Sequence, residues 1–138
     1  MKCRHSIISF LYYWLPPILY CVFIYSISSM PSVSIGPSLP HIDKLYHFIL
    51  YFILALLLYR ALSHTLKHVN RQYGLWMALI LTIIYGCSDE IHQYFVPLRK
   101  ADIWDLVFDA VGACVAIFSI IYIKNFTKFY KRSKDAGC

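Results

Sequence analysis

Stretches without a formal charge alternate with short polar segments along the 138 residues of this chain. A helix needs about 20 mostly apolar residues to cross a hydrocarbon core of about 30 Å, and four stretches approach or exceed that length. We therefore predict four membrane-spanning helices, over residues 6–29, 43–63, 72–96 and 102–123. Pro16 and Pro17 predict a kink in the first helix, and Pro97 predicts the end of the third.

The composition favours the same class of protein. Hydrophobic residues make up 59% of the chain and charged residues 14%, whereas a typical soluble domain has about 45–50% and about 25%. We predict an all-α integral membrane protein, a four-helix transmembrane bundle in which residues 1–138 form one domain. We expect no nucleic-acid partner despite the net charge of +6, because the charges are distributed as in a membrane topology.

The segments outside these helices are interpreted from their Pro, Gly and charged residues. Residues 30–40 are rich in Pro and Gly and are predicted to be an irregular linker. The basic tail, residues 124–138, is either a segment lying on anionic lipid or a solvated flank that stops transfer. A cleaved signal peptide is the alternative for the first helix, but its apolar run exceeds the usual length of about 7–15 residues.

The basic residues predict the orientation. With four spans both termini lie on one side, and that side holds all Lys and Arg residues except Lys44, Arg99 and Lys100. The positive-inside rule therefore predicts that both termini and the connection near Arg71 are cytoplasmic. The other two loops are then expected to face outward.

Acidic residues show the opposite distribution, because all except Asp135 fall near the outward ends of the last three helices. Steps of three or four residues place polar and small residues on one face of each helix. These faces are Asp43, His47, Tyr51 and Ala55; Thr82, Gly86, Glu90 and Gln93, flanked by Asp89; and Asp102, Asp105, Asp109, Gly112, Ala116 and Ser119. We predict that the three faces meet in an outward-opening polar pocket.

Each of these residues also has a plainer role. Asp43 and Asp102 stand where helix N-caps are expected, and Asp105 in a first turn would favour the helix dipole. Asp109 lies too deep to cap a helix, and its alternative to a ligand site is a pairing with Arg99, His47 or Gln93. His92 points away from the Glu90 face and is expected at a helix interface.

The sequence from Asp89 to Arg99, DEIHQYFVPLR, together with Asp43, Lys44, His47, Tyr51, Asp105, Asp109 and Gly112, resembles the VanZ-like family of bacterial membrane proteins. Three positions depart from the family pattern. Asp109 stands where Asn is usual, Leu98 stands where Gly is common, and Ala116 stands where a second Gly is common. The resemblance implies an α-helical inner-membrane protein, and the family's named member confers low-level resistance to the glycopeptide teicoplanin.

We favour a protein that binds, or modulates access to, a cell-envelope lipid headgroup or a lipoglycopeptide antibiotic. The predicted ligand-binding residues are Asp43, Lys44, His47, Tyr51, Asp89, Glu90, Gln93, Arg99, Asp105 and Asp109. In this interpretation Arg99, Lys100 and Lys44 contact phosphates, while the acids contact amide or sugar groups. The predicted helix-packing residues are Gly86, Gly112 and Ala116.

Three other functions stay open at this point: a metal-dependent enzyme acting on a lipid headgroup, a small proton-coupled carrier, and a purely structural partner of a larger complex. No nucleophile motif, HExxH, phosphate loop or CxxC supports an enzyme, so no catalytic residue and no cofactor are predicted. Whether the acids bind a divalent cation, and whether the chain forms oligomers, is left open. Membrane lipids, a cell-wall lipid precursor or a glycopeptide antibiotic are the expected partners.

Overall fold

The computed structural model describes residues 2–31, 42–66, 71–99 and 101–136. Within these residues every regular element is an α-helix: α1 (Lys2–Ser28), α2 (Ile42–Thr65), α3 (Arg71–Phe95) and α4 (Ile103–Ala136). Each helix is long and apolar enough to cross a membrane. The prediction of an all-helical chain with four such helices is therefore confirmed.

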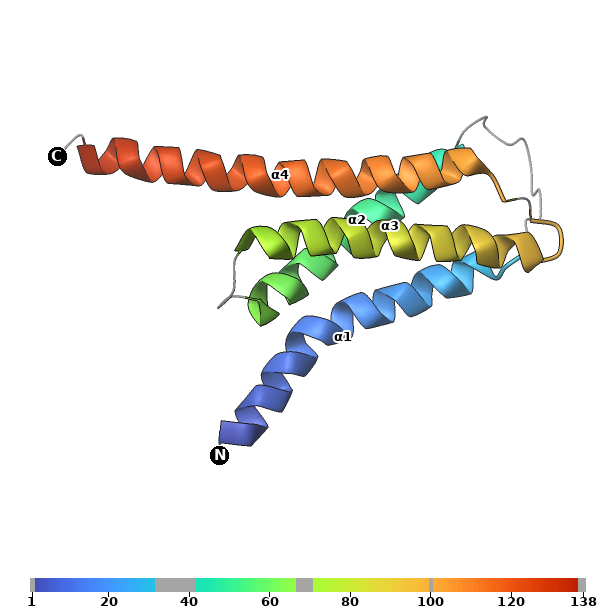
Figure 1. The fold of residues 1–138 in the computed structure, drawn as a ribbon, viewed down its shortest axis with the longest axis horizontal. Helices are drawn as coiled ribbons and strands as arrows, with labels where there is room; N and C mark the ends of the chain where they lie inside the picture. Colours follow the sequence, from blue (N-terminus) through green and yellow to red (C-terminus); the bar gives the residue numbers. More distant parts are fainter. Residues whose placement is uncertain (1, 32–41, 67–70, 100, 137–138) are drawn as a thin grey trace.

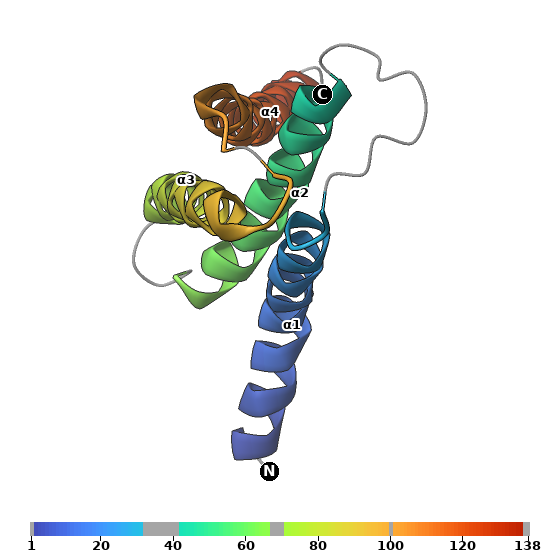
Figure 2. The ribbon, with the colours of Figure 1, turned by 90° about the vertical axis from the view of Figure 1, so that its right-hand side faces the viewer.

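α2 is the central helix of the bundle. It contacts each of the other three helices, whereas α1 and α4 do not contact each other in the described part of the chain (Figure 2). Successive helices run in opposite directions, so both chain ends lie at the end of the bundle where α2 leads into α3 (Figure 1). The opposite end holds the connections from α1 to α2 and from α3 to α4.

The ends of two helices differ from the prediction. α1 begins at Lys2 and stays helical through Pro16 and Pro17, changing direction midway as the proline pair predicted (Figure 1). α4 continues to Ala136, so the prediction of a tail separate from the helix after residue 123 is wrong. The reason lies in the sequence, because no Pro or Gly interrupts residues 124–136. The 34 residues of α4 span about 51 Å, well beyond a hydrocarbon core.

Polarity is arranged opposite to that of a water-soluble bundle. The large apolar side chains of α1 are mostly exposed, and only 11% of the residues in its most apolar 18-residue stretch are buried. Buried positions in α3 and α4 instead include Asp89, Glu90, Gln93, Asp105 and Asp109. Apolar side chains outside and carboxylates inside are the distribution expected when the surroundings are hydrocarbon. The helices thus have the character of a multi-pass membrane protein.

The turn between α3 and α4 contains one strained residue. The backbone N–H of Arg99 donates to the carbonyl of Val96 at 3.2 Å, and Leu98 within this turn has φ of 65°. A side chain in this left-handed conformation costs roughly 1–2 kcal/mol, and glycine avoids that cost. The conformation gives a physical reason for the glycine that resembling sequences commonly have after the proline.

We expect Leu98→Gly to raise the free energy of unfolding by about 1 kcal/mol, because relief of strain exceeds the entropy that glycine adds to the unfolded chain. Thermal melting of the purified protein in detergent measures this change. The control is Ile91→Gly, another exposed apolar position but inside α3, which should lower stability by about 1 kcal/mol. Destabilisation by both variants would show that Leu98 is not strained.

Candidate functional site

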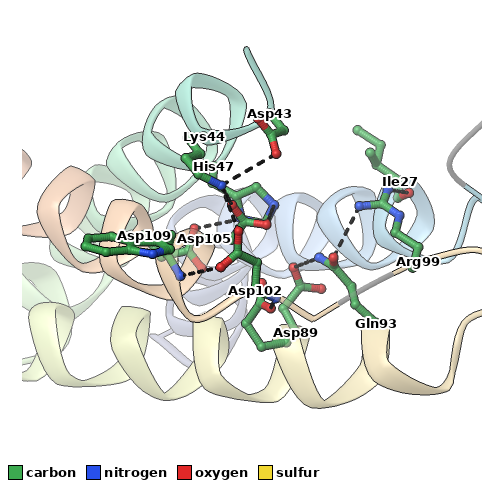
Figure 3. Close-up of polar contacts among 12 residues, drawn as sticks. Ile27, Asp43, Lys44, His47, Asp89, Gln93, Arg99, Asp102, Asp105 and Asp109 are labelled. Atoms are coloured by element: carbon green, nitrogen blue, oxygen red, sulfur yellow. Dashed lines mark hydrogen bonds and ion pairs between the residues drawn. The ribbon is translucent and has the colours of Figure 1, made fainter. Parts of the chain in front are cut away.

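Polar side chains from three helices and one turn gather at the end of the bundle where α3 leads into α4 (Figure 3). α2 contributes Lys44 and His47 from its first turns, and α4 contributes Asp105 and Asp109 from its own first turns. α3 contributes its last turns, because it runs in the opposite direction. Helical spacing of three or four residues puts each set on the inward face of its helix.

Lys44 forms the entrance to this cluster. Its ammonium donates to Asp102 Oδ2 at 2.9 Å and to Asp105 Oδ1 at 3.1 Å, and Asp43 Oδ2 lies 3.7 Å away. The Lys44 side chain is 13% exposed, while those of Asp43 and Asp102 are 63% and 40% exposed. The entrance therefore presents one ammonium between two accessible carboxylates. We call Asp43, Lys44 and Asp102 the mouth.

Asp102 has a second role as the N-cap of α4. Its Oδ1 accepts the backbone N–H of Trp104 at 2.9 Å, the contact that defines a capping carboxylate. That N–H, together with the Lys44 ammonium, holds the pKa of Asp102 below its usual value. Asp43 is not a cap, because α2 begins at Ile42 and Asp43 already lies within the first turn. The expected cap role is thus correct for Asp102 and wrong for Asp43.

A buried layer lies directly beneath the mouth. His47 Nδ1 lies 3.0 Å from Asp109 Oδ1, and His47 Nε2 lies 3.9 Å from Asp105 Oδ2. Glu90 reaches the same region from α3 and accepts the backbone N–H of Asp102 through Oε2 at 3.1 Å. Of the pairings open to Asp109, the structure thus gives the one with His47. We call His47, Glu90 and Asp109 the deep cluster.

The deep cluster is closed below by an aromatic ring and a glycine. Tyr51 is fully buried and stacks parallel to the His47 ring, with ring centroids 6.3 Å apart. A Cβ at Gly86 would lie 3.0 Å from Asp109 Oδ2 and 3.3 Å from Tyr51 Cε1. Gly86 therefore lets α3 approach the carboxylate closely. Ala116 lies deeper, in a small-residue contact with Ala55 and Ala113.

Asp89, Gln93 and Arg99 form a separate chain of contacts that leads away from the deep cluster. Gln93 Nε2 donates to Asp89 Oδ2 at 3.1 Å, and Arg99 Nη1 donates to Gln93 Oε1 at 3.3 Å. The guanidinium also donates to the carbonyl of Ile27 at 3.0 Å (Figure 3). It donates to the carbonyl of Met30 at 3.1 Å as well.

The pairing of Asp109 with Arg99, one of those predicted, is therefore not formed, while the contact of Arg99 with a phosphate stays a prediction. Arg99 pairs with no carboxylate of the described residues, since it is bound to carbonyls at the end of α1. Ile27 lies in the last turn of α1 and Met30 just beyond it, and a cation is favoured at the C-terminal end of a helix. Lys100, expected beside Arg99, and most of linker 30–40 lie outside the described residues.

An apolar groove between α2 and α4 opens beside the mouth. It has a volume of about 600 Å³ and is lined by Leu45, Phe48, Trp104, Phe108 and Val111, with Lys44 at its polar end. These apolar residues were not among the predicted site residues. Each is next in sequence to a predicted ligand-binding or helix-packing residue, but nothing else in the sequence separates them from apolar residues that face lipid.

His92 lies away from this site, at an interface with α1. Its Nε2 is 2.9 Å from Ser29 Oγ, and its ring stacks on Tyr25 with centroids 4.5 Å apart. His92 thus lies apart from the Glu90 face, as predicted.

Comparison with known proteins gives one positive result. The family described as VanZ/LLP1 matches residues 6–125, which is most of the chain and includes every residue of the mouth and the deep cluster. Neither the curated proteins nor the solved structures gave a significant match.

Proposed function

The chain belongs to the VanZ/LLP1 family, and from this membership and the site geometry we propose a multi-pass protein of the bacterial cell (inner) membrane that binds a phospholipid at its outward end. The observation that carries the proposal is the mouth, where an ammonium and two accessible carboxylates stand beside an apolar groove of about 600 Å³. A lipid combines the same two features, a polar headgroup and an apolar chain.

The charges of the mouth define the kind of headgroup. Lys44 offers an ammonium to a phosphate, and the carboxylates of Asp43 and Asp102 accept hydrogen bonds from amine or hydroxyl groups. The best complement is a phosphate next to an N–H donor, as in phosphatidylethanolamine. Phosphatidylcholine has the same phosphate and the same net charge, but its quaternary amine has no N–H to donate.

The groove supplies the contact for an acyl chain. Phe48, Phe108 and Trp104 provide aromatic surface along it, and Trp104 lies near the mouth, where amphipathic rings favour a membrane interface. Contact along the groove would hold one lipid in register with the mouth, which distinguishes a bound lipid from the surrounding bilayer.

Competition between the two headgroups tests this function. Purified protein in detergent is incubated with both lipids, and native mass spectrometry counts the lipids retained. We expect phosphatidylethanolamine to be preferred about tenfold, the effect of one hydrogen bond to a charged group. Lys44→Ala should weaken retention, while Lys128→Ala, an exposed lysine far along α4, should not.

Blocking the groove by substitution tests the acyl-chain contact separately, in the same retention experiment. Val111→Trp places a large ring inside the groove, whereas Val107→Trp adds the same ring to a position of similar exposure outside it. We expect only Val111→Trp to reduce lipid retention. The proposal would be contradicted if Lys44→Ala and Val111→Trp retained both lipids as well as their controls, Lys128→Ala and Val107→Trp, do.

A teicoplanin-type lipoglycopeptide is the second candidate ligand, because it also joins an acyl chain to amine and hydroxyl groups. Adding teicoplanin to the competition experiment distinguishes the two candidate ligands, the phospholipid and the antibiotic. If teicoplanin displaced the lipid, and the variants that weaken lipid retention also weakened binding of the antibiotic, a role in resistance would be favoured. If the lipid stayed bound, the lipid would be favoured as the ligand.

The orientation in the membrane is a further part of the proposal. Basic residues concentrate at the end of the bundle that holds both termini, which the positive-inside rule assigns to the cytoplasm. In a cysteine-free background we expect an impermeant thiol reagent to label Gly36→Cys from outside the cell and to leave Val69→Cys unlabelled. Labelling at position 69 alone would reverse the orientation.

A further inference from the structure

The deep cluster has the composition of a transition-metal site. One ligand atom from each of His47, Glu90 and Asp109 can be chosen so that all three lie within 4.8 Å of one another, and all three residues are buried. Bonds of about 2.0–2.2 Å from a metal to nitrogen and oxygen ligands place such atoms at most about 4.4 Å apart. Side-chain movements of less than about 1 Å therefore bring the three atoms into coordination range.

Two of these side chains have buried oxygen atoms without a partner. Glu90 Oε1 and Asp109 Oδ2 accept no hydrogen bond from the residues that the structure describes, although Asp109 has a fully buried side chain and Glu90 is only 9% exposed. A buried carboxylate oxygen that lacks a donor is unfavourable, and a bound cation is one way to satisfy it. Both oxygens belong to the residues that form the deep cluster.

The charge around the deep cluster points in the same direction. Asp89, Glu90, Asp105 and Asp109 are buried together, and Lys44 is the one lysine or arginine of the described residues in an ion pair with any acid here. Arg99 is turned to carbonyls of α1 and does not compensate them. A divalent cation would balance this excess of negative charge.

His47 lies between two carboxylates, one on each side of its ring. One ring nitrogen faces Asp109, while the other faces Asp105 at 3.9 Å, and Asp105 is itself fixed by Lys44 at 3.1 Å. A carboxylate behind the second nitrogen orients the ring and makes the ligating nitrogen more basic. Asp105 is therefore a positioning residue in this arrangement.

We propose that His47, Glu90 and Asp109 bind one divalent transition-metal ion, with Zn²⁺ preferred over Mg²⁺. A nitrogen ligand with two carboxylates suits Zn²⁺, whereas Mg²⁺ favours oxygen ligands and retains its water. The three protein ligands leave coordination positions for water or for a group of a bound molecule. This proposal does not depend on which lipid occupies the mouth.

Metal binding by the purified full-length protein tests the proposal. The protein in detergent is stripped with a chelator, titrated with Zn²⁺ or with Mg²⁺, and analysed by calorimetry and elemental analysis. We expect one Zn²⁺ per chain and at least 100-fold weaker binding of Mg²⁺. His47→Gln, Glu90→Gln and Asp109→Asn should each weaken Zn²⁺ binding by more than 100-fold, and Asp105→Asn by about 10–100-fold.

The matched control is His92→Gln, which removes a histidine of the same end of α3 that contacts α1 instead of the deep cluster. It should leave Zn²⁺ binding unchanged. Less than one Zn²⁺ per wild-type chain, or retention of Zn²⁺ by the three ligand variants, would overturn the proposal.

A second measurement covers the case in which a ligand variant does not fold. Co²⁺ bound to the wild-type protein should give a visible absorption band, and Zn²⁺ should displace it and raise the melting temperature. A wild-type melting temperature that Zn²⁺ leaves unchanged would overturn the proposal. Lipid retention is measured separately, so a failure of the metal site is distinguishable from a failure of lipid binding.

Discussion

Gly112→Ala will lower the melting temperature of the purified protein by about 10 °C, equivalent to a loss of about 3 kcal/mol of stability. An added Cβ would clash with the carbonyl oxygen of Phe48 and lie 3.2 Å from the backbone nitrogen of Phe52. Because these are backbone atoms of α2, no rotamer change can relieve the clash, and α2 and α4 must move apart. The groove and the mouth are built across this same interface.

Two other glycines provide graded controls in the same melting experiment. Gly74→Ala adds a Cβ with its nearest contacts at 3.5 Å, so stability should stay the same or rise slightly. Gly86→Ala meets Asp109 Oδ2 at 3.0 Å, a side-chain atom that can shift, so its effect should be intermediate. Equal melting temperatures for the Gly112 and Gly74 variants would contradict the close packing of α2 on α4.

Lys44→Met will lower the free energy of unfolding by about 3 kcal/mol, the usual loss when one partner of a buried ion pair is removed. The methionine keeps the apolar stem, but it leaves Asp105, whose side chain is only 8% exposed, without its 3.1 Å partner. Asp102 loses less, because its side chain is 40% exposed and the Trp104 N–H still binds it. Chemical or thermal unfolding in detergent measures the loss.

The cause of that loss can be isolated with a second substitution. Adding Asp105→Asn to Lys44→Met removes the uncompensated carboxylate, and we expect it to restore about 1–2 kcal/mol. Lys128→Met changes an exposed lysine at the other end of α4 and should alter stability by less than about 0.5 kcal/mol. If Asp105→Asn further destabilised the Lys44→Met variant, the ion pair would not be the source of the effect.

The helices could be predicted from the sequence because a membrane span needs a long apolar run, and such runs are visible without any knowledge of packing. The end of α4 could not, since the basic residues after residue 123 were taken to mark the end of the helix as well as of the apolar run. A charged segment without Pro or Gly ends the apolar run but not the helix.

The polar residues of the site could be grouped from the sequence because steps of three or four residues define the faces of a helix. That argument brings His47, Glu90 and Asp109 to one end, where the structure also has them. It could not give the direction of Arg99, because the turn at Leu98 decides which neighbouring helix a side chain there can reach. The apolar groove was equally hidden, since its residues differ in no way from those that face lipid.

Photo-crosslinking to a diazirine-labelled phosphatidylethanolamine is the decisive test of lipid binding at the mouth and the groove, because it reports where a lipid is held on the protein in its own membrane. The proposal predicts crosslinks concentrated on the groove residues Phe48, Phe108 and Val111, reduced by Val111→Trp and unaffected by Val107→Trp. Crosslinks spread evenly over the exposed faces of all four helices, and unchanged by Val111→Trp, would contradict a specific lipid site.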